Sequence, residues 1–307
     1  MSVNRTTFNV SLIQMQEHLR TSQALYEEAT IPASTGKKIN TLSDSAAGTN
    51  KVISLKNLSQ QVDQFQKNLS SVKLRLQFTE SQLTSSADVL NSVKELAIQS
   101  NNASTSDQER SAISTQIDTL RDQLLSLANQ KFDNKYVFSG SATNVKPFIE
   151  SSGSIVFNTA GGANSTEILV NTAFDIDIAI NVDGNEIFSG DGGGVDVFSL
   201  LDDLQAHIES GDSDAVGDDL DSLATASDQI QSAISTVGSR QRYLDQLEER
   251  LSNDALRYIT SLAEVQDAPL EQVYPNLINQ ETALKLIYAS SSRVFDTMSQ
   301  LQQSLMR

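Results

Sequence analysis

Residues 55–97 read LKNLSQQVDQFQKNLSSVKLRLQFTESQLTSSADVLNSVKELA, and their apolar side chains recur in alternating steps of three and four. One heptad register holds Leu55, Val62, Leu69, Leu76, Leu83, Leu90 and Ala97. A second tract in the other half of the chain repeats the step at Leu223, Ile230, Val237, Leu244, Leu251, Tyr258 and Val265. This period keeps one apolar seam along one side of a helix, so the two tracts predict long helices that pack against partners.

Polar residues interrupt the complementary register of the first tract. That register holds Leu58, Phe65, Val72, Thr79, Ser86 and Val93. Polar residues within a seam commonly set the helix register, so Thr79 and Ser86 indicate packing and not catalysis. Residues 113–127 carry a third apolar seam, and Ser106 with Glu109 has the spacing of a capping box before it. The sequence therefore predicts an αα-hairpin.

Between the two helical tracts the apolar period becomes twofold. Phe174, Ile176, Ile178, Ile180 and Val182 alternate with other residues, as in a half-buried strand. Asp183–Gly184 predicts a hairpin turn after this strand, leading back through Ile187 and Phe188. Residues 154–157 and 168–170 are expected to be further strands. The helical pattern resumes over 197–209.

The predicted fold class is mainly α with a β insert. The N- and C-terminal halves would form a long antiparallel helical bundle or coiled coil, and a small β-rich outer domain would interrupt it. Three parts are expected: terminal helices from residues 1–42 with 268–307, a helical bundle from 43–135 with 217–267, and an acidic insert from 136–216.

Each end of the chain carries an amphipathic helical pattern with one apolar stripe. The stripe residues are the candidate assembly interface: Phe8, Leu12, Met15, Leu19, Leu277, Leu284, Ile287, Val294, Met298, Leu301 and Leu305. One such helix alone buries too little apolar surface to offset the entropy lost on ordering its backbone. The ends are therefore expected to pair, and to be disordered in the monomer and ordered on assembly.

Prolines and caps indicate where helices end. The first helix is expected to stop at Ile31–Pro32, because proline disfavours helical backbone at the preceding residue. Ser43 or Asp44 is the candidate N-cap of the next helix. Pro269 fits the first turn of the last helix, whereas Pro275 should kink or split it.

The net charge of −17 is concentrated in one region. From Pro147 to Ser239 there are 17 Asp and Glu residues and no Lys or Arg, so the remainder of the chain is charge-balanced. An acidic centre argues against nucleic-acid binding, which needs a basic surface. No apolar run approaches the length of a membrane span, so membrane insertion is not expected. The N-terminal sequence also lacks a signal-peptide pattern.

The composition argues against an enzyme. The chain has no cysteine and only two histidines, His18 and His207, which leaves little material for acid-base chemistry or zinc binding. Asp183–Asn185 and Asp191–Asp196 suggest a calcium loop, but the EF-hand spacing and its terminal Glu are missing, so ordinary turns are the preferred interpretation. No cofactor, metal or catalytic residue is predicted.

Several segments resemble a known family. Residues 35–40 read TGKKIN before Ser43–Asp44, residues 136–140 read YVFSG, and residues 93–101, 237–244 and 280–284 carry further matches. Together they resemble the flagellin superfamily over residues of about 4–145 and 220–305, and YVFSG is similar to a signature of its hook-filament junction branch. The motif residues are Gly36, Lys37, Ile39, Asn40, Asp44, Tyr136, Phe138 and Gly140. Ser45–Ala46 departs from the family's usual Asp-Pro.

The resemblance implies an extracellular structural subunit of the bacterial flagellum, exported through the flagellar type III pathway without a cleaved signal peptide. It would self-associate in a ring layer between an adjoining hook-associated protein and flagellin. A flagellar export chaperone would cover the C-terminal helix before export. Two alternatives stay open at this point: flagellin itself, and a helical-stalk protein whose insert carries a binding module or an enzyme.

Overall fold

The computed structural model describes residues 2–41, 43–102 and 105–305; for residues 2–9, 11, 298 and 301–305 it describes the backbone alone. The chain divides into two compact units. Unit 1 contains the residues up to 60 and those from 255 onward, and unit 2 contains residues 61–254. The mainly helical fold with a small antiparallel β part confirms the predicted fold class.

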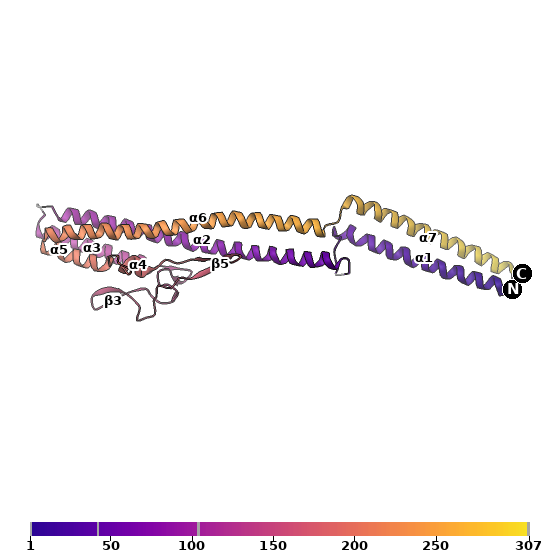
Figure 1. The fold of residues 1–307 in the computed structure, drawn as a ribbon, viewed down its shortest axis with the longest axis horizontal. Coiled ribbons are helices and arrows are strands. Elements are labelled where there is room, and N and C mark those ends of the chain that lie inside the picture. The colour runs from indigo at the N-terminus through magenta and orange to yellow at the C-terminus, as the bar shows by residue number, and fades with distance from the viewer. Residues whose placement is uncertain (1, 42, 103–104, 306–307) are drawn as a thin grey trace. The chain divides into compact units, whose positions relative to one another are not determined.

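Unit 1 is built on two terminal helices. Helix α1 (Ser2–Thr35) lies beside α7 (Leu270–Leu305), and the two run antiparallel (Figure 1). The unit also contains the first part of α2 (Ala46–Ser100) and the last part of α6 (Ser213–Gln266).

Neither proline interrupts these helices, so the predicted stop at Ile31–Pro32 and the predicted split at Pro275 were wrong. Helix α1 continues through Pro32 and ends at Thr35. The next residue, Gly36, has a φ of 69°, a left-handed conformation that glycine adopts without strain. The Gly36 N–H donates to the Pro32 carbonyl at 2.9 Å and closes the last turn. Helix α7 contains Pro275 and is not split there. Pro269 was expected in the first turn of α7, and it lies directly before Leu270, where α7 begins.

In unit 2, α2 and α6 lie side by side (Figure 1). The residues of the predicted main register are buried from Val62 to Ala97 and from Leu223 to Leu251, and we call them the seam. Charged side chains also join the two helices. The Lys73 ammonium on α2 lies 2.6 Å from Asp245 and 3.0 Å from Glu248 on α6.

Two shorter helices complete the bundle. Helix α3 (Asp107–Ala128) starts with the predicted capping box: Ser106 Oγ accepts the Glu109 N–H at 3.3 Å, and Glu109 accepts the Ser106 N–H at 2.8 Å. This confirms the predicted start of the helix after residue 106. Helix α5 (Val197–Ser210) confirms the helix predicted over 197–209.

The insert contains three two-stranded antiparallel sheets. Their strands are β1 (Lys131–Phe132) with β2 (Lys135–Tyr136), β3 (Phe148–Ser151) with β4 (Ser154–Phe157), and β5 (Leu169–Ala173) with β6 (Ile176–Ala179). The strand predicted over 154–157 is confirmed. The core of the insert is a cluster of phenylalanine rings in which neighbouring ring centroids lie about 5–6 Å apart: Phe138, Phe148, Phe157, Phe188 and Phe198.

The hairpin predicted at Asp183–Gly184 was wrong. Asp183 instead caps the short helix α4 (Gly184–Ser189), because its carboxylate accepts the Asn185 N–H at 2.9 Å. The chain reverses one strand earlier, between β5 and β6, where Asp175 has a φ of 56°. An Asp-Gly pair fits a tight turn and a helix start equally well, so the local sequence did not separate them.

Candidate assembly interface

The predicted stripe residues of the two terminal helices are mostly half-buried where their side chains are described. Leu12, Met15 and Leu19 on α1 are half-buried. On α7, Leu277, Leu284 and Ile287 are also half-buried, whereas Val294 is exposed. Phe8, Met298, Leu301 and Leu305 lie outside the residues whose side chains are described.

A different set of apolar side chains is exposed on α7, and the sequence analysis missed it. Its members are between 46% and 60% exposed and share one side of the helix: Leu270, Tyr274, Ile278, Tyr288 and Phe295. We call this set the α7 stripe. Its signal in the sequence is that successive members are four, four, ten and seven residues apart, which keeps them near one side of a helix. Helix α1 also exposes Val10, Ile13, Leu25 and Ile31.

The connection from α1 to α2 is ordered around one carboxylate. Asp44 accepts the N–H groups of Asn40 at 2.7 Å and Thr41 at 2.8 Å, and the Thr41 hydroxyl at 2.8 Å. These hydrogen bonds, the Thr41 N–H first, hold the pKa of Asp44 below its ordinary value. Ser45 Oγ accepts the Gly48 N–H at 3.0 Å, so Ser45 caps α2 and the expected cap at Ser43 or Asp44 was wrong.

The connection from α6 to α7 is joined to the same turn. Lys37 pairs with Asp267 in an isolated antiparallel bridge, and the Ala268 N–H donates to the Gly36 carbonyl at 2.9 Å. Ile39 is buried and lies so close to Gly48 that a side chain there would meet it at 2.4 Å. The motif residues Gly36, Lys37, Ile39, Asn40 and Asp44 therefore build this joint within unit 1.

The YVFSG segment is part of the insert core and not of an exposed surface. Phe138 is fully buried, and its ring packs edge-on against Phe188. Gly140 has a φ of 65°, and a Cβ there would lie 1.8 Å from the Asn164 carbonyl oxygen. Tyr136 packs under the Lys131 ammonium, 4.5 Å from its ring centroid. The motif thus fixes the start of the insert.

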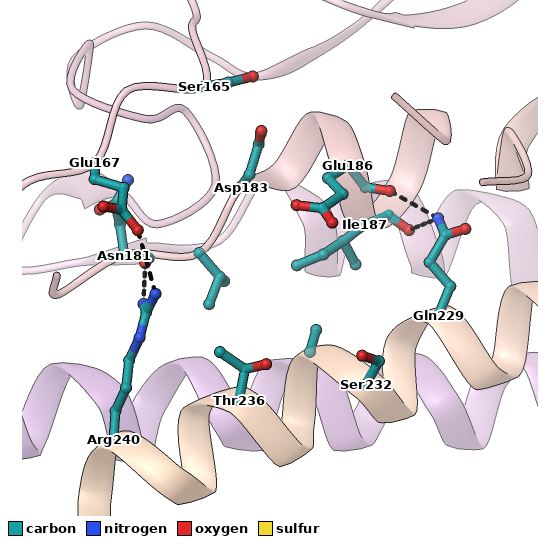
Figure 2. A pocket seen from close by; sticks show the side chains of 12 residues that line it. Ser165, Glu167, Asn181, Asp183, Glu186, Ile187, Gln229, Ser232, Thr236 and Arg240 are labelled. Carbon is teal, nitrogen blue, oxygen red and sulfur yellow. Dashed lines mark hydrogen bonds and ion pairs between the residues drawn. The ribbon is translucent and has the colours of Figure 1, made fainter. Parts of the chain in front are cut away.

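Helix α6 also contacts the insert through polar side chains that sequence reasoning did not single out. Figure 2 shows Gln229 and Arg240 reaching from α6 toward the insert, with Ser232 and Thr236 between them. These residues line a cavity of about 350 Å³. The acceptors that Gln229 and Arg240 contact are mainly backbone carbonyls, which carry no sequence signature.

Among the described residues, no group of three or more His, Asp or Glu residues is arranged to hold a metal ion. Helices long and apolar enough to cross a membrane are likewise absent from the described part of the chain. His207 Nδ1 lies 2.7 Å from Asp219, whose hydrogen bond raises the pKa of His207. The other histidine, His18, is exposed.

Comparison with known proteins finds relatives among flagellar proteins. The model of the bacterial flagellin N-terminal helical region matches residues 7–143. Flagellar hook-associated protein 3 of Escherichia coli is 25% identical over 90% of this chain and 92% of its own length. The chain is therefore similar to proteins of the flagellin superfamily, and its similarity to hook-associated protein 3 extends over most of both chains.

Two further relatives extend this similarity. The solved structure of a flagellar hook-associated protein of Vibrio parahaemolyticus is 25% identical, with a TM-score of 0.67, covering 73% of this chain and 100% of that one. A flagellin of Listeria monocytogenes is 24% identical over 97% of this chain and 96% of its own length. The bacterial flagellum is therefore where this protein resides, and it assembles with other flagellar components.

Proposed function

We propose that this protein is a structural subunit that forms the junction layer between an adjoining hook-associated protein and the flagellin filament. It would self-associate as a ring, bind flagellin on one side, and carry no enzymatic activity. The observation that carries the proposal is the pair of terminal helices, which expose a long row of large apolar side chains. Contiguous apolar surface of this kind is typical of protein–protein contacts.

The terminal helices support assembly because they bury so little. Among the described side chains of α1, those of Ser22 and Ala29 alone are buried, and none of the described side chains of α7 is buried. Helices gain most of their stability in proteins from packing an apolar face. The α7 stripe and the exposed residues of α1 would find that packing against neighbouring subunits, so both helices become ordered on assembly.

The same exposed surface supports the two remaining proposals. An apolar helix that waits for its partners is an aggregation hazard, so an export chaperone would cover α7 in the cell. The chain would leave by flagellar type III export and function outside the cell. The chaperone would then cover α7 before export, and neighbouring subunits would cover it in the flagellum.

Gene deletion with complementation tests the junction role. Without the protein, we expect hooks that carry no filament and flagellin monomers released into the medium. A complementing variant with Ile278→Ser and Phe295→Ser, which alters the α7 stripe alone, should leave the same defect. Normal filaments in the deletion strain would refute the proposal.

A matched control separates the interface from general damage. Leu74 is 59% exposed on α2 within unit 2, so Leu74→Ser makes a similar change outside the terminal helices. We expect this variant to restore filaments. Far-ultraviolet circular dichroism of both purified variants should show unchanged helix content relative to the parent protein.

Flagellin remains the second candidate, because the Listeria flagellin matches nearly the whole chain. A filament subunit should add to its own kind without limit. We expect the purified protein to add to isolated hooks as one short layer, which electron microscopy resolves. Long filaments grown from this protein alone would favour the flagellin role.

A further inference from the structure

Arg240 on α6 holds the β5–β6 hairpin through its backbone. Its Nη1 donates to the Asn181 carbonyl at 2.6 Å and to the Ala179 carbonyl at 3.4 Å, and its Nη2 lies 3.3 Å from Glu167. Asn181 joins the two legs of the hairpin, because its side chain accepts the Ile168 N–H at 2.7 Å. A planar guanidinium suits this fork of acceptors. One side chain therefore contacts both legs.

Gln229, three turns earlier on α6, holds the loop after α4. Its Nε2 donates to the carbonyls of Glu186 at 2.8 Å, Ile187 at 2.7 Å and Val195 at 3.3 Å, and its Oε1 accepts the Val195 N–H at 3.0 Å. A Cβ on Gly194 would lie 2.1 Å from that Oε1, so the loop approaches the amide as closely as a glycine permits.

A cavity lies between these two attachments. Ser232 and Thr236 face it from α6, with Ile187 opposite (Figure 2), and Val182 also lines it. At its far end the hairpin contacts α2 through the edge-on ring pair of Phe65 with Phe174, in which Phe174 is 43% exposed. Polar contacts to carbonyls thus attach the hairpin and the loop to α6 at the two ends of this cavity.

We propose that Arg240 and Gln229 are positioning residues, each of which sets one part of the insert on the bundle. Arg240 positions residues 166–181, and Gln229 positions residues 186–195. Each part opens separately, while the heptad seam of α2 and α6 stays folded. This arrangement fixes the outer surface that the insert presents, and it does not depend on the proposed junction role.

Hydrogen exchange of the isolated full-length protein, resolved by peptide mass spectrometry, tests this. In Arg240→Gln we expect exchange in residues 166–181 to rise about tenfold or more, because the lost bonds come from a charged donor. In Gln229→Ala the rise should fall on residues 186–195 instead. Arg240→Lys keeps the positive charge but loses the planar set of guanidinium N–H donors, so exchange in residues 166–181 should rise by an intermediate amount.

The controls distinguish positioning from ordinary core stability. Ser232→Ala lies between the two attachments and should change neither segment. Amides of residues 76–97 in the seam should exchange at the parental rate in every variant. Unchanged exchange of 166–181 in Arg240→Gln would overturn the proposal. A uniform rise that includes the seam would also overturn it, since Arg240 would then stabilise the bundle as a whole.

Discussion

The seam of unit 2 and the terminal helices of unit 1 follow the same apolar periodicity, yet they differ in burial. In the seam, Leu76, Leu83 and Leu90 are fully buried within one chain. On α7, seam positions such as Leu277 and Leu284 are half-buried at best. Periodicity therefore indicates where a helix has an apolar face, and it does not indicate whether one chain can cover that face.

The largest expected difference between the two regions is in backbone protection. We expect amides of residues 12–35 and 270–297 in the free subunit to exchange on the order of 100-fold faster than those of residues 76–97, because few contacts oppose their opening. Hydrogen exchange on the monomer and on assembled material measures this. Equal protection of the terminal helices in both states would remove the contrast.

Side-chain truncation on a single helix sharpens the contrast. Leu76→Ala removes a fully buried side chain, so we expect the free energy of unfolding to fall by about 2–5 kcal/mol. Leu74→Ala, two residues away, removes a side chain that is 59% exposed and should cost less than about 0.5 kcal/mol. Urea denaturation followed by circular dichroism compares them. Similar costs would mean that unit 2 lacks a tightly packed seam.

A glycine pair extends the test to the insert. Gly140→Ala places a methyl group against the Asn164 carbonyl at a positive φ, and we expect it to destabilise unit 2 by about 2–4 kcal/mol. Gly153 has a φ of 88° but open space around it, so Gly153→Ala should cost about 1 kcal/mol from the backbone alone. The midpoint temperatures of thermal unfolding show which of the two variants is less stable, and we expect it to be Gly140→Ala. The reverse order would contradict the packing described for Gly140.

The smallest expected effect is a pH dependence at the turn between α5 and α6. Asp219 raises the pKa of His207, with smaller contributions from Asp203 and Asp212, and Arg110 lines the same small cavity. Protonated His207 therefore stabilises the fold fully below about pH 6.5, and this contribution is lost as pH rises through the raised pKa.

Denaturation at two pH values measures this effect against a variant. The His207 side chain is 38% exposed, so solvent screening should keep its contribution below about 1 kcal/mol. We expect the stability difference between the parent protein and His207→Gln to shrink from pH 6 to pH 8. A difference that grows over this range would have the wrong sign for a raised pKa.

The sequence predicted the helical part well because its signals are local and repeated. Heptads placed the buried seam of α2 and α6, and the capping box placed the start of α3. The single-residue signals were less reliable: Pro32 and Pro275 lie inside continuous helices, and Asp183 caps a helix instead of starting a hairpin turn. Each of these residues is compatible with two local structures, and tertiary packing selects one.

The candidate site was only partly predictable for a different reason. Periodicity located the predicted stripe residues of α1 and α7, but it missed the exposed α7 stripe, because exposure of Tyr274, Ile278 and Phe295 depends on which face the partner helix covers. The attachment of the insert was not predictable, since Gln229 and Arg240 bind carbonyl groups that every residue possesses. The assembly role of the predicted stripe residues stays a proposal.

The attachment through Arg240 also bears on how freely the insert can vary. Because the guanidinium donates to the backbone carbonyls of Ala179 and Asn181, its binding does not depend on most of the side chains around them. Much of the hairpin's outer sequence could therefore change without a change in the helix that carries it.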